Sequence, residues 1–328
     1  MVSVNHYFEE IDVLKGIAIL LIIFGHCFCE YPVNFGETNL TILQHFCLSF
    51  HLNLFFVASG ILFSFKTQWG LFIRKKTKRL LIPWGVFTLV ALFLKIMFSN
   101  FTHGQVGSIH RALLLDLTCG NSYWFIYALF IMMVTTKMIK NLRVFILICI
   151  SLFIIQYYLR DFKPEYNILC FTRVVHFYPW FLLGVIIKNY YSTASDYLKT
   201  SPQINLTAGF SILLAMLVLL ITGWSRIFVV SRYVMPLLGC IATWHFSFII
   251  CKKGRINKCF TFFGKYSLQF YLNHLLIMLC CYYLGAQVFY YSHTLALFTI
   301  FLSALLFSMF MFWLEMKLKP ISFLFGFL

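Results

Sequence analysis

The chain has 328 residues, of which 61% are hydrophobic, 20% are aromatic and only 11% are charged. Soluble domains usually carry about 25% charged residues, so this composition excludes a soluble globular protein and predicts an all-α polytopic membrane protein. The formal net charge of +16 does not indicate a nucleic-acid partner, because most basic residues gather on one side of the predicted spans.

Ten apolar segments are long enough to cross a bilayer as helices, which takes roughly 20 residues each. The loops on one side of these segments, together with the C-terminus, hold 18 Lys and Arg residues, and the opposite loops hold 6. The positive-inside rule therefore predicts that both termini are cytoplasmic. The loops are short, so we expect one transmembrane domain over residues 1–328. The predicted spans are 11–29, 42–65, 80–98, 122–139, 143–159, 171–187, 204–222, 232–250, 266–285 and 293–314.

Two other classes of feature are not expected. The first ten residues hold Glu9 and Glu10 rather than a basic segment, which argues against a cleaved signal peptide. Ten of the eleven cysteines lie in or beside apolar segments and none has zinc-ligand spacing, so we expect reduced, buried thiols and no bound metal.

The first span, DVLKGIAILLIIFGHCF, carries three ionisable side chains. At 100° per residue, Lys15 and His26 lie within about 20° of each other and about 16 Å apart along the axis, and Asp12 lies about 40° to the other side of His26. Charged groups in a span cost a few kcal/mol, so this stripe is expected to face a protein interior or an aqueous cavity. A simple Asp12–Lys15 pair, snorkelling to the boundary, and a structural hydrogen bond for His26 remain equally good interpretations.

The next two spans add further candidates. His51 lies in HFCLSFHLNLFFVASGILFSF (45–65), which approaches from the outer side. The following span begins after FIRKKTKRLLIPW (72–84), a dense basic run. This run is either a positive-inside signal that only sets the topology, or a surface that binds phosphates, for which Arg and Lys are suitable donors.

Six motifs, in this order, carry a family resemblance. DVLKGIAILLIIFGH, FHLNLFFVASG, KRLLIPW, NSYWFIYALF (121–130), HFYPWFLLGVIIK (176–188) and FGKYSLQFYLNH (263–274) resemble the successive motifs of acyltransferase family 3, membrane proteins that transfer acyl groups. The set is most similar to the subgroup of sugar O-acetyltransferases such as fucose 4-O-acetylases. Lys15 stands where many members have arginine, which keeps the charge but loses bidentate recognition. Asn53 stands where the second motif often has proline.

The resemblance implies an O-acetyltransferase in a bacterial inner membrane, with acetyl-CoA as donor and a cell-surface polysaccharide or its lipid-linked precursor as acceptor. It implies that His26 is the general base or a transient acyl carrier. His51 either assists or orients it or is a structural hydrogen-bond partner, and Lys15, held in place by Asp12, is a further catalytic candidate that could also meet the donor's phosphates. The donor's phosphates would meet Arg74, Lys75, Lys78 and Arg79.

Candidates for acceptor binding lie in later spans. Trp124 would stack on a sugar or an adenine, although tryptophan at a helix start is also a common interfacial anchor. Ser267, Tyr271 and His274 fall within about 60° of one another on one helix, where they would line a cavity or form an interhelical polar seam. His176, near an outer helix end, is interpreted as interfacial.

Two alternative functions stay open. The first is a transporter or permease of an envelope glycan or acyl compound. It is disfavoured because the chain has only seven prolines, so broken helices are few, and because no internal repeat is visible. A sensor without catalysis is disfavoured by the presence of both Lys15 and His26. We expect membrane lipid and a glycan as partners and no nucleic acid, and a homo-oligomer is left open.

Overall fold

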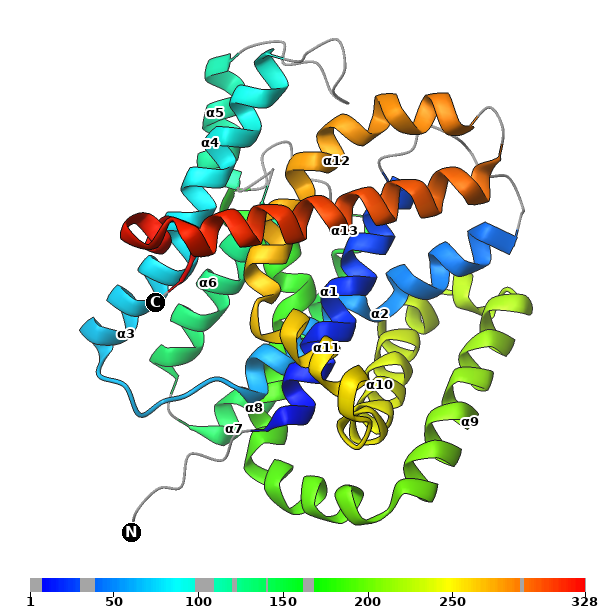
Figure 1. The fold of residues 1–328 in the computed structure, drawn as a ribbon. Coiled ribbons are helices and arrows are strands. Elements are labelled where there is room, and N and C mark those ends of the chain that lie inside the picture. Colours follow the sequence, from blue (N-terminus) through cyan, green and yellow to red (C-terminus); the bar gives the residue numbers. More distant parts are fainter. Residues whose placement is uncertain are drawn as a thin grey trace.

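The computed structural model describes residues 8–29, 39–97, 109–119, 123–139, 141–161, 168–289 and 292–327, and every regular element in these ranges is helical (Figure 1). The prediction of an all-α protein is confirmed. The elements are α1 (Glu9–Cys29), α2 (Asn39–Ile61), α3 (Trp69–Lys76), η1 (Thr77–Leu81), α4 (Ile82–Met97), α5 (Ile109–Cys119), α6 (Trp124–Met138), α7 (Leu142–Tyr158), η2 (Ile168–Cys170), α8 (Phe171–Thr200), α9 (Pro202–Ile221), η3 (Trp224–Arg226), η4 (Val230–Val234), α10 (Met235–Cys251), α11 (Gly254–Lys265), α12 (Ser267–Phe289), α13 (His293–Lys317) and η5 (Lys319–Phe325).

Seven helical stretches among the described residues are long and apolar enough to cross a membrane. The other three predicted spans coincide with α6, α7 and α12, and of these α6 and α7 are apolar but shorter. That the chain has ten spans and that both termini are cytoplasmic therefore remain predictions. Three features extend the predicted scheme: α8 continues to Thr200, α5 lies in the predicted loop 99–121, and α11 lies between the spans of α10 and α12.

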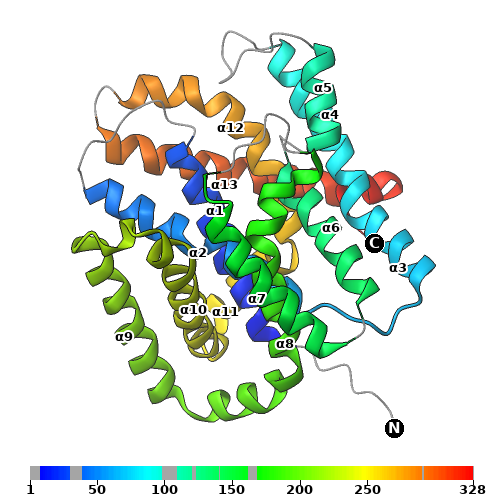
Figure 2. The ribbon, with the colours of Figure 1, turned by 180° about the vertical axis from the view of Figure 1, so that it is seen from behind.

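Helix α1 lies at the centre of the bundle, with α2, α10, α11, α12 and α13 packed around it (Figure 1). Its approach to α11 is very close. A Cβ on Gly16 would collide with the carbonyl of Phe260, and one on Gly264 would collide with the carbonyl of Asp12. Small residues at helix crossings allow backbones to meet in this way. Around this centre, α7 packs against α8 and α9 packs against α10 at the edge of the bundle (Figure 2).

The first turn of α1 is anchored by its acidic residues. Glu10 is 2% exposed, and its carboxylate accepts hydrogen bonds from Ser195 Oγ at 2.6 Å and Tyr191 OH at 3.3 Å. Lys199 Nζ lies 3.5 Å from the same carboxylate oxygen. Carboxylates near a helix N-terminus also complement its dipole. These contacts hold the start of α1 against the end of α8.

A glutamine on α7 compensates for a proline inside α8. Pro179 has no N–H, so it leaves the carbonyl of Val175 without its helical donor. Gln156 Nε2 donates to this carbonyl at 3.1 Å and to that of His176 at 3.1 Å. In a bilayer such freed backbone groups must be satisfied by neighbouring helices. The contact fixes the N-terminal part of α8 against α7.

Prolines also explain two π-turns. Arg79 lies in η1 and Arg232 lies in η4, and each is followed four residues later by a proline, Pro83 or Pro236. The missing proline N–H cannot bond to the arginine carbonyl, which favours the wider i to i+5 pattern of a π-helix. Both arginines line pockets.

Candidate active site

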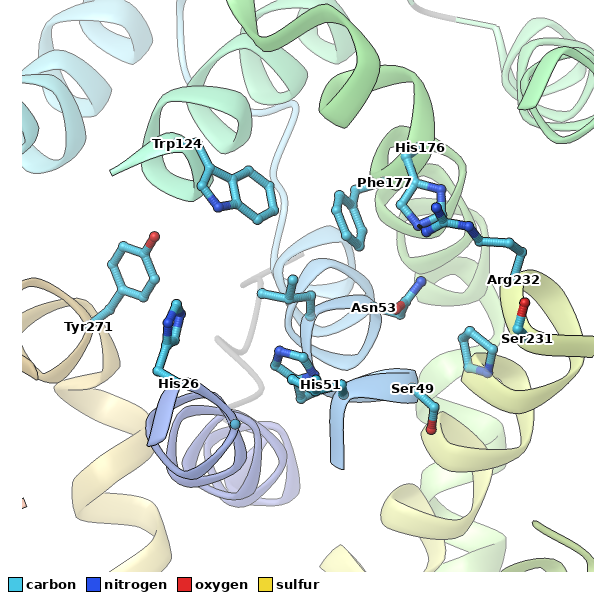
Figure 3. Close-up of a pocket in the computed structure, with 14 residues that line it drawn as sticks. His26, Ser49, His51, Asn53, Trp124, His176, Phe177, Ser231, Arg232 and Tyr271 are labelled. Carbon is cyan, nitrogen blue, oxygen red and sulfur yellow. Dashed lines mark hydrogen bonds between the residues drawn. The ribbon is translucent and has the colours of Figure 1, made fainter. Parts of the chain in front are cut away.

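A central pocket of about 350 Å³ lies between the second half of α1 and the helices around it. In Figure 3 the side chains of His26, His51, Trp124 and Tyr271 come from four different helices and are directed toward the same space. The lining residues are Gly25, His26, Leu48, Ser49, His51, Leu52, Asn53, Trp124, His176, Phe177, Ser231, Arg232, Pro236 and Tyr271.

His26 lies in an aromatic and imidazole surround. Its ring centroid is 5.2 Å from that of His274, which in turn is 5.5 Å from that of Tyr271. His274 is fully buried, and its Nδ1 lies 3.1 Å from the carbonyl of Phe270. A carbonyl only accepts, so Nδ1 carries the proton and Nε2 of a neutral ring is a free acceptor. Within the described part of the chain, neither His274 Nε2 nor His26 Nδ1 has a hydrogen-bond partner.

The second predicted histidine shares this pocket. His51 is 6% exposed, and its Nδ1 has no partner among the described residues. Asn53, two residues later on α2, also lines the pocket, and its Nδ2 is likewise without a partner among the described residues. Buried polar atoms without partners are rare in folded proteins and here leave donors and acceptors available to a ligand.

A second cavity of about 380 Å³, which we call the arginine pocket, adjoins the central one and shares Trp124, His176, Phe177 and Arg232 with it. The guanidinium of Arg173 lies 4.7 Å from the centroid of Trp124, and Trp124 stacks on Phe177 at 5.5 Å. Trp124 is thus already covered by protein groups. The lining residues are Trp124, Gln156, Leu159, Arg160, Thr172, Arg173, Val175, His176, Phe177, Phe228 and Arg232.

A third cavity of about 180 Å³, which we call the basic pocket, lies toward the start of α1. Lys15 lines it and also pairs with Asp12 at 3.2 Å, so the i, i+3 interpretation of that pair is correct. The other cations around it are Lys76, Arg79 and Lys265. Of the predicted phosphate-binding residues only Arg79 lines this pocket; Arg74, Lys75 and Lys78 are exposed and do not.

Tyr271 lines both the central pocket and the basic pocket. Its side chain is 3% exposed, and the rings of Phe125 and Tyr123 lie 5.1 Å and 6.2 Å from it. Ser267, one turn earlier on α12, lines the basic pocket only. The stripe on α1 follows the same direction, because Lys15 reaches the basic pocket and His26 reaches the central pocket.

Several pocket residues were not predicted. His176, interpreted from the sequence as interfacial, lines two pockets, and Arg173 and Arg232 were counted only among the six basic residues of the less basic side. Lys76 and Lys265 were likewise not singled out. The available signal was the motif HFYPWFLLGVIIK for His176 and the Arg-to-proline spacing for Arg232.

No described cysteine is among the residues that line the three pockets. Five described cysteines are buried: Cys27, Cys47, Cys149, Cys170 and Cys240. Over the described ranges, no three His, Cys, Asp or Glu side chains gather to hold a metal ion.

Comparison with protein families identifies the class. A family model described as an acyltransferase domain, that of acyltransferase family 3, matches residues 8–314. The chain therefore belongs to acyltransferase family 3 and is a membrane acyltransferase. No match was found among curated proteins, and none was found among solved structures.

Proposed function

We propose that the protein is an O-acetyltransferase of the bacterial inner membrane, which transfers an acetyl group from cytosolic acetyl-CoA to a hydroxyl of a cell-surface polysaccharide or its lipid-linked precursor. The observation that carries this proposal is that Tyr271 lines two pockets of different chemistry. One is surrounded by lysines and an arginine, and the other holds His26 and His51. A donor and an acceptor can thus meet from opposite ends at one residue.

The basic pocket suits the donor. Lys15, Lys76 and Arg79 offer charged hydrogen-bond donors, which phosphates prefer. The positive-inside rule places these residues on the cytosolic side, where acetyl-CoA is made available. At about 180 Å³ the pocket lies below the range of roughly 300–1,000 Å³ that encloses drug-sized ligands, so it takes the thioester arm and leaves the phosphates at its mouth.

The central pocket suits the reaction itself. As general base, His26 accepts the proton of the sugar hydroxyl while its oxygen attacks the thioester carbonyl; the C–S bond breaks and CoA leaves as the thiolate. As acyl carrier, the imidazole nitrogen attacks the thioester carbonyl first and CoA leaves as the thiolate; the sugar oxygen then takes the acetyl group from the nitrogen, and the hydroxyl proton passes to the nitrogen that is freed. Both routes use one neutral imidazole nitrogen of His26.

The full-length protein in lipid nanodiscs tests the proposal. With acetyl-labelled acetyl-CoA and an extract of lipid-linked glycans, wild type should release free CoA thiol and label the glycan, and His26→Ala should do neither. His45→Ala is the matched control, since His45 is exposed and lines none of the three pockets. Rapid quenching followed by peptide mass spectrometry separates the two routes, because only the carrier route leaves acetyl on His26. Movement of glycan across vesicles without consumption of acetyl-CoA would instead support a transporter.

A further inference from the structure

The arginine pocket gathers positively charged side chains on the side of the protein that is predicted to be outer, where Lys and Arg residues are few. Arg160, Arg173 and Arg232 line it, and these are three of the six basic residues in the predicted outer loops and helix ends. Of the residues placed by the structure, no acidic one lines this pocket or the central pocket. Asp161, which pairs with Arg160 at 3.1 Å, has a side chain that is 89% exposed. The positive charge of the three arginines is thus little neutralised by carboxylates around the two pockets.

The innermost of these cations is Arg173. Its guanidinium lies over the ring of Trp124, and its Nη1 atom is buried without a hydrogen-bond partner in the part of the chain that the structure places. A cation–π contact with an aromatic ring offsets only part of the desolvation of a guanidinium. A buried charged donor without a partner is costly, and an oxygen anion in the cavity would satisfy it.

The second cation is held by a neutral group. Arg232 Nη1 donates to His176 Nε2 at 3.0 Å. Because arginine only donates, this histidine nitrogen accepts, its proton is on Nδ1, and the ring carries no charge. The contact therefore aims the guanidinium without neutralising it. Figure 3 shows the Arg232 guanidinium against His176, on the side of the central pocket away from Tyr271.

We propose that the arginine pocket binds an anionic group of the acceptor, so that the glycan substrate is an acidic one: its carboxylate or phosphate oxygens pair with Arg173 and Arg232 while a nearby hydroxyl reaches His26. This inference rests on the proposed function. The planar guanidinium fork matches carboxylate and phosphate geometry, and the four residues shared by the two pockets place such an anion beside the histidines. The anion belongs either to an acidic sugar or to the diphosphate of a lipid carrier.

Binding to the full-length protein in nanodiscs tests the inference, with two probe pairs that separate the two sources. The first pair is methyl glucuronide and its neutral partner methyl glucoside, and the second is farnesyl diphosphate and farnesol. At least one anionic probe should bind at least about tenfold more tightly than its neutral partner, and added salt should weaken that binding. Preference for the glucuronide assigns the site to an acidic sugar, and preference for the diphosphate assigns it to a lipid carrier.

Variants locate the effect. Arg173→Gln and Arg232→Gln should each weaken the binding of the favoured probe by about tenfold, as expected for loss of a charge-assisted hydrogen bond. Arg226→Gln is the matched control, because Arg226 is an exposed arginine of η3 that lines neither pocket. Thermal unfolding shows whether each variant is folded.

Two results would overturn the inference: equal binding of charged and neutral probes, or unchanged binding in both variants. Acetyl-CoA binding is measured on the same samples. Loss of anion preference with intact acetyl-CoA binding rejects only the acceptor assignment, whereas failure of wild type to bind acetyl-CoA rejects the proposed function itself.

Discussion

The imidazole of His26 on α1 and the imidazole of His274 on α12 lie 5.2 Å apart between ring centroids, with their planes tilted by 58°. The two rings come from opposite ends of the chain and are brought together where α12 packs along α1. His274 lines none of the three pockets described above, and its ring contacts those of His26 and Tyr271, which line them.

His274→Ala should therefore behave as a change in a positioning residue. We expect kcat to fall by about 10- to 100-fold with little change in the KM for acetyl-CoA, because the proposed donor site is the basic pocket. His245→Ala is the control, since His245 contacts Asn205 on α9 at 2.9 Å and lies away from the three pockets. A parallel rise in KM, or a shared loss in both variants, would indicate a general structural defect instead.

We expect only some residues of the basic run 72–84 to affect the KM for acetyl-CoA. Lys76→Ala and Arg79→Ala should raise the KM for acetyl-CoA by about five- to tenfold, because both side chains line the basic pocket. Arg74→Ala should change it less than about twofold, because Arg74 does not line the basic pocket. Lys258→Ala, an exposed lysine of α11, gives the baseline. Steady-state kinetics at varied donor concentration would contradict the assignment if Arg74→Ala matched Arg79→Ala.

The aromatic ring of Tyr271 should separate the two pockets. Tyr271→Ala removes the side chain that both pockets share, and we expect hydrolysis of acetyl-CoA without acceptor to rise relative to transfer. Tyr271→Phe keeps the ring and should preserve the ratio of hydrolysis to transfer. The measurement is release of CoA thiol with and without glycan; equal ratios in wild type and Tyr271→Ala would rule out this role.

Gln156 on α7 should stabilise the protein mainly because Pro179 on α8 lacks an N–H. Gln156→Leu leaves the carbonyls of Val175 and His176 without their donor, and we expect a loss of about 1–2 kcal/mol of stability. In a Pro179→Ala background the new N–H can bond to Val175, so the same Gln156→Leu change should cost less. Thermal unfolding of the four proteins gives the coupling, and additive losses would disprove it.

The crossing of α1 and α11 should tolerate no side chain. Gly264→Ala would place a Cβ against the carbonyl of Asp12, and we expect it to destabilise the protein by about 1–3 kcal/mol. Gly85→Ala on α4 is the control, since nothing lies within 4 Å of its Cβ position. That variant should be neutral or slightly stabilised because alanine favours helix. Equal unfolding temperatures for the two variants would contradict the close packing.

The helices and the stripe on α1 were predictable because hydropathy and the 100° helical repeat are local properties of the sequence. The periodicity of Lys15 and His26 indicates one face, and the structure directs that face into the bundle. The composition of the arginine pocket was not predictable in this way. Arg173, Arg232 and Trp124 come from three separate elements, and their meeting depends on tertiary packing that no local pattern reports.

The basic run illustrates a second limit. Spacing along an ordinary helix assigns every residue a direction, but η1 is a π-turn, so the directions after Thr77 do not follow the 100° rule. The run could therefore be recognised as a candidate phosphate surface, but the direction of Arg79 required the structure. Arg74 and Lys76 precede the π-turn on α3, and which of them lines the pocket depends on how α3 packs.

The two π-turns have a consequence for recognising related molecules. Arg79 and Arg232 each stand third in their π-turn and four residues before a proline, one at the basic pocket and one at the arginine pocket. A single missing N–H therefore sets the direction of a guanidinium at each end of the site. An Arg-x-x-x-Pro sequence at the start of an apolar run, present twice in one chain, is thus a search pattern for chains with the same two π-turns, even where their other motifs have diverged.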